Sequence, residues 1–334
     1  MALPKKTKRI LTRDAFIFCI IIIIMYKYYQ WKEQQFIYED DDIMPEEEEQ
    51  PLFPEPGVMF VETTDNLNVS ALSVCSIESA ARMYPQKPVV YFMKGLNDSK
   101  ASISTHYKAF DVLKTLSNVY LIPLDYKLLF NHTPLLYWYQ KVNPANEIYW
   151  IHVISDASRL ALLWKYGGIY FDTDVISVRQ IPKRNFLAAE SSSSSSNGVM
   201  GFERHHYFPW KCMKNFVRNY RRNVWGNNGP RLVTHILKIY CDLPDFTKTG
   251  DINCHNISVL HPNRFYPIPF AKWEEYFEPV TVMPAFSNSY ALHLWNYMNK
   301  DKKKTIVADS GSLAEKLFIR YCPLTYKTFV KNIR

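Results

Sequence analysis

Asp172 and Asp174 are the residues of this sequence whose type and spacing most clearly suit chemistry. They follow the short β-prone run Ile169–Phe171, and side chains two positions apart on a strand point to the same side. Two carboxylates at the mouth of a buried strand are hard oxygen ligands for a divalent cation, and a cation held there suits a diphosphate. The pair therefore predicts a metal-assisted reaction on a diphosphate substrate.

A helix is expected just before this strand, and it carries a second pair of charged residues. Ser155 or Asp156 can cap its amino terminus, and Gly167 with the glycine after it supplies the left-handed residue that ends many helices. Asp156 and Arg159 are three residues apart, so they share one face of the helix. We expect this face to meet the site of the two aspartates.

The remaining pattern predicts the elements that position these residues. Strands are expected at 58–64, 89–93, 119–122, 186–190 and 198–203, and a helix at 71–84. Strands that alternate with helices favour an α/β fold with a mostly parallel sheet, in which ligands bind at the carboxyl ends of the strands. Glu62 and Thr63 would then lie on the same rim as Asp172 and Asp174. The serine run at 191–196 is typical of a flexible insertion.

The composition fits one large folded domain and argues against a nucleic-acid partner. The 334 residues are 47% hydrophobic and 15% aromatic, enough for a single α/β core. The formal net charge is +8, but the basic residues are scattered and form no recognised nucleic-acid-binding motif. A positively charged domain suits an anionic substrate near an anionic membrane.

The amino-terminal residues predict a membrane anchor. The run Ala15–Tyr26 contains twelve residues without a charge, which is short of the ~20 residues of an ordinary span. Snorkelling of Arg13 and Lys27 can lengthen it, and no small-x-small cleavage site follows. The positive charge before the run places the amino terminus in the cytosol, and a short span favours Golgi membranes. We expect a cytosolic tail at 1–13, a signal anchor at 14–31, an acidic stem at 32–57 and a lumenal catalytic domain at 58–334.

Cysteines and glycosylation triplets agree with a lumenal address. Five cysteines lie beyond the predicted anchor, and because five is odd, at least one stays free or pairs between chains. The short interval favours a bridge between Cys241 and Cys254. Acceptor triplets for N-glycosylation begin at Asn68, Asn97, Asn131 and Asn256.

The stretch from Ser155 to Val175 resembles the Asp-x-Asp glycosyltransferases that use nucleotide sugars. Their pattern runs Ser-Asp-x-x-Arg, a helix, then Gly-Gly-x-Tyr-x-Asp-x-Asp, and every defined position is present. Further matches, to the α-1,4-glycosyltransferases and over nearly all of 58–330, include the runs Phe60–Thr64, Cys75–Arg82, Trp225–Pro230 and Tyr290–Asn296. The resemblance implies a GT-A-like nucleotide-sugar transferase domain, with a mostly parallel mixed sheet flanked by helices.

The resemblance also implies a reaction. A member of this family would move a hexose, either galactose or an N-acetylhexosamine, from a UDP-sugar to the 4-position of a terminal sugar on a glycolipid. The α configuration would be retained, and Mn²⁺ or another divalent cation would be bound. Such an enzyme is expected to be a single-pass type II protein of the Golgi membrane that acts in glycosphingolipid synthesis.

Site residues are carried over position by position. Asp172 and Asp174 are expected to bind the cation, with His293 as a third ligand because the family has a C-terminal His-x-Trp segment. Asn228 is expected beside the two aspartates as a catalytic residue, although the family pattern has Gln there. The expected donor-binding residues are Glu62, Thr63, Asp156, Arg159, Tyr170 and Asn197, with Arg159 on phosphate or sugar and Asp156 on a sugar hydroxyl.

Two other classes of function remain open at this point. A phosphatase of the haloacid-dehalogenase type also has Asp-x-Asp after a strand, but places it on the first strand, whereas here it follows several predicted elements. A catalytically inactive glycan-binding protein is the third possibility. The intact set of Asp172, Asp174 and Arg159 argues against an inactive site.

Overall fold

The computed structural model describes residues 15–28, 53–97, 107–241, 243 and 250–331. The chain divides into two units, Met1–Glu48 and Glu49–Arg334. In the first unit residues 15–28 are helical, and no helix within the described ranges is both long and apolar enough to cross a membrane. The predicted tail at 1–13 and most of the predicted stem at 32–57 lie outside the described residues.

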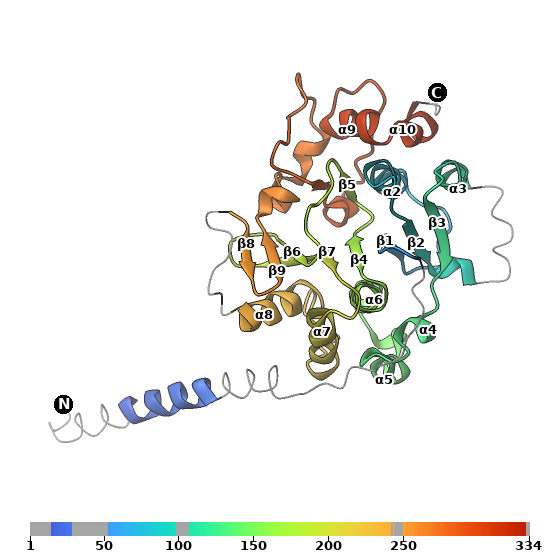
Figure 1. Ribbon diagram of the computed structural model, residues 1–334. Coiled ribbons are helices and arrows are strands. Elements are labelled where there is room, and N and C mark those ends of the chain that lie inside the picture. Colours follow the sequence, from blue (N-terminus) through green and yellow to red (C-terminus); the bar gives the residue numbers. More distant parts are fainter. Residues whose placement is uncertain (1–14, 29–52, 98–106, 242, 244–249, 332–334) are drawn as a thin grey trace. The chain divides into compact units, whose positions relative to one another are not determined.

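The second unit is built on a mixed sheet of eight described strands in the order β3-β2-β1-β4-β7-β6-β9-β8 (Figure 1). A separate two-stranded ladder joins β10 to β5. The strands are β1 (Val58–Glu62), β2 (Val89–Met93), β3 (Val119–Pro123), β4 (Gly168–Phe171), β5 (Val175–Ser177), β6 (Phe186–Ala189), β7 (Ser195–Phe202), β8 (Ile252–Cys254), β9 (Ile257–Leu260) and β10 (Ala291–His293).

The strand directions explain where the site lies. β3, β2, β1 and β4 are parallel neighbours, so their carboxyl ends share one edge of the sheet. β7 runs antiparallel to β4 and to β6, which makes the sheet mixed. β2 is buried at every position, and its continuous apolar run Val89–Met93 is typical of a central parallel strand with both faces covered.

Helices cover both faces of this sheet. Figure 1 shows α2, α3, α9 and α10 on one side and α4 to α8 on the other. The helices are α2 (Ala71–Met83), α3 (Lys108–Leu113), α4 (Tyr126–Phe130), α5 (Leu135–Lys141), α6 (Trp150–Tyr166), α7 (Tyr207–Arg218), α8 (Pro230–Cys241), α9 (Leu313–Tyr321) and α10 (Pro323–Phe329). Short 3₁₀ helices are η1 (Lys94–Asn97), η3 (Pro144–Asn146), η4 (Pro262–Arg264), η5 (Phe270–Phe277) and η6 (Asn296–Lys300).

Two sequence-based boundaries are wrong. α6 begins at Trp150, so Ser155 and Asp156 lie inside the helix and cap nothing. Asp156 bonds instead to Asn197 of β7, and Ser155 accepts from Arg159 one turn further along the same helix. β7 begins at Ser195 and takes the last two serines of the expected insertion, because Ser195 pairs with Ala189. The predicted end of α6 is confirmed: Gly167 has φ 65°.

Two disulfides join parts of the second unit. The expected bridge between Cys241 and Cys254 is confirmed. A second bridge, which the spacing did not suggest, joins Cys75 in α2 to Cys322, the residue before α10. Cys212 is buried and remains a free thiol.

Candidate active site

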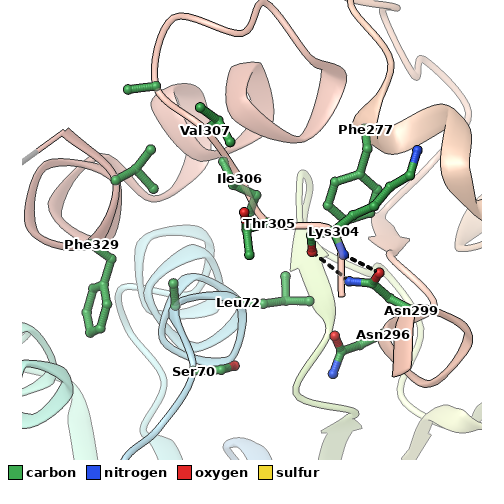
Figure 2. A pocket seen from close by; sticks show the side chains of 13 residues that line it. Ser70, Leu72, Phe277, Asn296, Asn299, Lys304, Thr305, Ile306, Val307 and Phe329 are labelled. Carbon is green, nitrogen blue, oxygen red and sulfur yellow. Dashed lines mark hydrogen bonds between the residues drawn. The ribbon is translucent and has the colours of Figure 1, made fainter. Parts of the chain in front are cut away.

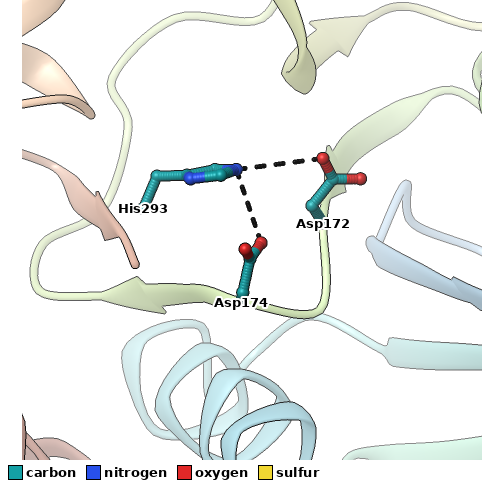
Figure 3. A group of neighbouring side chains, drawn as sticks. All are labelled: Asp172, Asp174 and His293. Carbon is teal, nitrogen blue, oxygen red and sulfur yellow. Dashed lines mark ion pairs between the residues drawn. The ribbon is translucent and has the colours of Figure 1, made fainter. Parts of the chain in front are cut away.

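Asp172, Asp174 and His293 converge at the carboxyl edge of the sheet (Figure 3). Asp172 follows β4, Asp174 precedes β5, and His293 ends β10, where it pairs with Val175. Nε2 of His293 lies 3.4 Å from Oδ1 of Asp174 and 3.9 Å from Oδ2 of Asp172. The ladder between β5 and β10 therefore brings the distant histidine to the two aspartates.

The turn after His293 fixes the orientation of its ring. The backbone N–H of Trp295 donates to Nδ1 of His293 at 3.2 Å, and that of Asn296 donates to Oδ2 of Asp174 at 2.8 Å. Trp295 has a φ of 56°, which is uncommon for a bulky residue and persists where the surroundings determine it. The result is that Nε2 faces both carboxylates.

The charges of the three side chains depend on one another. Burial opposes ionisation of Asp172, but Arg159 and His293 hold the pKa of Asp172 below its usual value. Burial raises the pKa of Asp174, against the lowering effect of His293. Burial also opposes protonation of His293, yet Asp174 and Asp172 raise its pKa above the usual value. The cluster stabilises positive charge placed between its carboxylates.

The residues fit a divalent cation. One ligand atom from each of Asp172, Asp174 and His293 lies within 4.8 Å of the other two. Metal–ligand bonds of about 2.0–2.3 Å to a shared ion produce separations of this size. Carboxylate oxygens suit Mn²⁺, and imidazole is a ligand of transition metals in general.

Arg159 reaches the cluster from α6 and holds Asp172. Its Nη1 lies 2.9 Å from Oδ1 of Asp172 and donates to the carbonyl of Asn197 at 2.8 Å. Its Nη2 donates to Oγ of Ser155 at 2.8 Å, and Nε to the carbonyl of Ser155 at 3.2 Å. The sequence predicted a contact with phosphate or sugar, whereas most donors of this buried guanidinium are engaged within the protein.

Tyr170 lies beneath this ion pair. Its ring centroid is 4.6 Å from the guanidinium carbon of Arg159, and its hydroxyl donates to Oδ1 of Asp172 at 2.9 Å. The side chain is 1% exposed. The sequence predicted Tyr170 as a donor-binding residue; in the structure it orients Asp172.

Asp156 and Asn197 form the second half of the network. Nδ2 of Asn197 donates to Oδ1 of Asp156 at 2.7 Å, while its carbonyl accepts from Arg159. Burial raises the pKa of Asp156 to about 6, against the opposing effects of Arg159 and Asn197. Asp156 is therefore a buried carboxylate whose charge is only partly compensated.

Two glycines lie directly against carboxylates, and the sequence reasoning missed both. A Cβ on Gly198 would lie 2.6 Å from Oδ2 of Asp172, and a Cβ on Gly229 would lie 2.5 Å from Oδ2 of Asp156. Such distances leave no room for a side chain. Each glycine follows an asparagine that the sequence did predict as a site residue. The Asn-Gly pair was therefore the pattern that could have indicated the glycine.

The other predicted residues surround this centre. Glu62 and Thr63 lie at the end of β1, beside β4, and the carboxylate of Glu62 accepts from the N–H and hydroxyl of Thr64 at 2.8 and 2.7 Å. Asn228 is 2% exposed, and its amide contacts Asn227 and the carbonyl of Arg221 within its own loop. That loop meets Asp156 through the glycine after Asn228.

A cavity of about 630 Å³ borders η6 (Figure 2). Its lining is mostly apolar and comes from the start of α2, η5, the segment 304–308 and α10. Asn299 closes one side by bonding to the backbone N–H and carbonyl of Lys304. Asn296 lines the cavity and donates its N–H to Asp174, so it connects the cavity with the cluster.

Comparison with known proteins identifies the family. The model described as "Glycosyltransferase sugar-binding region containing DXD motif" matches residues 70–193, and "Alpha 1,4-glycosyltransferase conserved region" matches 201–329. The human α-1,4-N-acetylglucosaminyltransferase is 50% identical over 277 residues, which are 83% of this chain and 81% of that protein. The chain belongs to the α-1,4-glycosyltransferase family.

A second relative within the family is the human lactosylceramide 4-α-galactosyltransferase. It is 39% identical over 279 residues, covering 82% of this chain and 78% of that protein. A solved structure of the galactosyltransferase LgtC with donor and acceptor sugar analogs is 15% identical and covers 82% of this chain and 96% of that one, with a TM-score of 0.41.

Membership of the α-1,4-glycosyltransferase family settles the class of reaction. The chain is a hexosyltransferase, since its relatives transfer N-acetylglucosamine or galactose. The phosphatase and the inactive binding protein considered from the sequence are therefore set aside. The mixed sheet flanked by helices is the arrangement expected of a GT-A-like nucleotide-sugar transferase domain.

Proposed function

We propose that the chain transfers a hexose from a UDP-sugar to the 4-position of a terminal β-galactoside on a glycolipid, with retention of the α configuration. The observation that carries the proposal is the grouping of Asp172, Asp174 and His293 within 4.8 Å at the carboxyl edge of the sheet. Mn²⁺ is the cation we propose there. When bound, it would supply charge neutralisation for the diphosphate of the donor.

Side chains of the protein orient the proposed cation ligands and the groups that would bind the donor. Arg159 and Tyr170 keep Asp172 ionised and oriented. Asp156, held by Asn197, is placed to accept a hydrogen bond from a donor-sugar hydroxyl. Glu62 and Thr63 at the end of β1 form the nucleotide side of the rim, and Asn228 acts through the loop that carries Gly229.

The two relatives rank the donors to be tested. The 50% identity to an N-acetylglucosaminyltransferase makes UDP-GlcNAc the first donor to test, and the 39% identity to a galactosyltransferase makes UDP-Gal the second. UDP-GalNAc is the third, since a few pocket side chains decide whether an N-acetyl group is accepted. The lactosylceramide in the name of the second relative supports a glycolipid acceptor.

We also propose the membrane arrangement predicted from the sequence. Residues 1–13 would be cytosolic, 14–31 a signal anchor and 32–57 a stem, with 58–334 in the Golgi lumen. Basic residues before the uncharged run Ala15–Tyr26 support this orientation. Protease protection of the domain in intact Golgi vesicles is the matching test.

The experiment is a transfer assay with the full-length chain, three UDP-sugars and lactosylceramide or lactose. We expect transfer from one donor, dependence on Mn²⁺ and loss of activity with a chelator. The anomeric proton coupling of the product reports the configuration. Release of UDP without a glycoside product, for every donor, contradicts the proposal.

A further inference from the structure

Three aromatic side chains from separate elements contact one another near residues of the site. The ring centroids of Trp225 and Tyr297 are 5.9 Å apart, with an interplanar angle of 19°. His152 meets Tyr297 edge-on, at 5.0 Å and 90°. Trp225 is 49% exposed and Tyr297 41% exposed. Large aromatic surface left open to solvent at a catalytic centre indicates a contact with a ligand.

The chain ties each ring to a residue of the site. Tyr297 follows Asn296, whose N–H donates to Asp174. Trp225 lies in the loop that brings Gly229 against Asp156. His152 lies four residues before Asp156 on α6, about one turn away. Each ring therefore lies within four positions, along the chain, of a residue that belongs to the site or contacts it.

The chain brings Trp225 to the ring group from the side of β7. The sheet order puts β1, with Glu62 and Thr63 at its end, on one side of β4 and β7 on the other. The loop of Trp225 leads into α8, which packs on the β7 side, where Thr234 bonds to the backbone of Ser195. Trp225 thus approaches from the β7 side, whereas His152 stands next to Ile151, whose carbonyl accepts from the hydroxyl of Thr63 at 3.5 Å.

Resting on the proposed function, we propose that the Trp225–Tyr297 pair is the platform for the acceptor sugar. A galactopyranose has an axial 4-hydroxyl on one face and a C–H surface on the other. Stacking of that C–H surface on an aromatic face turns the 4-hydroxyl away from the ring and toward the cluster. Lys300 lies 4.4 Å from the ring centroid of Tyr297, so Trp225 offers the more open surface.

The platform places the acceptor oxygen for the transfer step. O4 of the galactoside forms a bond to the anomeric carbon of the donor while the bond from that carbon to the UDP oxygen breaks. UDP leaves with the electron pair, and the proton of the 4-hydroxyl passes to the leaving phosphate oxygen. The configuration is retained when O4 approaches from the face on which UDP departs.

The test measures acceptor and nucleotide binding separately in the full-length chain. Lactose is the acceptor probe, and UDP with Mn²⁺ is the nucleotide probe. We expect Trp225→Ala to raise the KM for lactose at least ~10-fold, Tyr297→Ala to raise it less, and Trp225→Phe to recover most of the loss. The Kd for UDP, measured by calorimetry, should change by less than about twofold.

The controls distinguish this claim from the proposed function. Tyr120→Ala removes a tyrosine of similar exposure (42%) from the edge strand β3, and should change neither quantity. An unchanged KM for lactose in Trp225→Ala overturns the platform. An equal weakening of UDP binding in Trp225→Ala also overturns the platform, because it indicates that the rings contact the uracil of UDP. Saturation-transfer NMR with lactose needs no turnover: if no donor is used but lactose still binds through Trp225, the platform stands and the assigned transfer fails.

Discussion

Carboxylates are buried in two regions of the second unit, the site around Asp172 and the contact between α2 and the C-terminal helices. We name the second region the C-terminal clasp; it comprises Glu78, the Cys75–Cys322 bridge and the start of α10. Glu78 is fully buried, and its oxygens accept from the N–H groups of Leu324 and Thr325 and the hydroxyl of Thr325. Every acceptor contact of this carboxylate serves the fold.

Two carboxylates of the active site, unlike Asp172, lack enough partners to offset their burial. Asp156 and Asp174 have raised pKa values because burial is not matched by enough donors. In the clasp, Arg82 adds a charged partner to Glu78 at 2.8 Å. The buried carboxylate of the C-terminal clasp has protein partners and stabilises the fold. The carboxylates Asp156 and Asp174 have too few protein partners, which leaves them available to a ligand.

The largest effect should follow from removing a proposed cation ligand. Asp174→Asn should lower kcat/KM at least ~1000-fold, about 4 kcal/mol, because charge neutralisation of the diphosphate is lost. Tm should stay the same or rise, since burial already disfavours the charge of Asp174. Steady-state kinetics and thermal melting check this, with the exposed Glu203→Gln as a matched acid control. A folded variant with near-normal kinetics would show that the reaction does not need the carboxylate of Asp174.

In the C-terminal clasp, a substitution should lower stability and leave catalysis unchanged. Glu78→Ala leaves the start of α10 without its acceptor, and we expect a loss of about 3 kcal/mol of unfolding free energy. At about 2.1 cal/mol/K of unfolding entropy per residue, Tm of a unit that runs from Glu49 to Arg334 should fall by about 5 °C. The kcat of the folded fraction should be unchanged. Arg82→Ala is the control: its side chain is 42% exposed, so the change should stay below about 1 kcal/mol.

Asp156 should make stability depend on pH with a defined sign. Its pKa is raised from 3.8 to about 6 by burial, so the folded state holds the proton more tightly than the unfolded state. Its contribution is full below about pH 4 and is lost as pH rises through 6, a change of up to about 3 kcal/mol. Asp156→Asn should therefore be more stable than the wild type at pH 7, with a smaller difference at pH 4. Chemical denaturation at both pH values measures this, and a pH-independent difference argues against it.

The smallest of these effects concerns the geometry of the guanidinium. Arg159→Lys keeps the charge but loses the planar fork that joins Asp172 to Asn197. We expect kcat/KM to fall at least ~10-fold, about 1.4 kcal/mol, together with a modest loss of stability. Arg184→Lys, at an 87% exposed side chain, is the matched control and should change neither kcat/KM nor stability. Normal kinetics in Arg159→Lys would show that Asp172 needs no such support.

The sequence predicted the parts of the site that follow from local pattern. Asp172 and Asp174 could be placed on one side of a strand end, and Asp156 and Arg159 on one helical face, because both periods are local. His293 came only from the resemblance, since the β5–β10 ladder that delivers it joins residues more than a hundred positions apart. The start of α6 was misplaced because the helix begins at Trp150, and the serine and aspartate that usually cap helices bond to Arg159 and Asn197 instead.

Close approaches could not be predicted at all. Whether a Cβ fits at Gly198 depends on the rotamer of Asp172, and at Gly229 on how its loop folds over Asp156. The ring contacts of Trp225 with Tyr297 depend in the same way on two loops meeting. Such features arise from packing between distant segments and leave no period in the sequence.

Direct binding of Mn²⁺ tests the central claim, that Asp172, Asp174 and His293 hold the catalytic cation. Electron paramagnetic resonance of free Mn²⁺, titrated with the full-length chain in the presence of UDP, measures the affinity without turnover. We predict saturable binding by the wild type, at least ~10-fold weaker binding by Asp174→Asn and by His293→Ala, and unchanged binding by Glu203→Gln. Equal affinity of the wild type and Asp174→Asn would contradict the account.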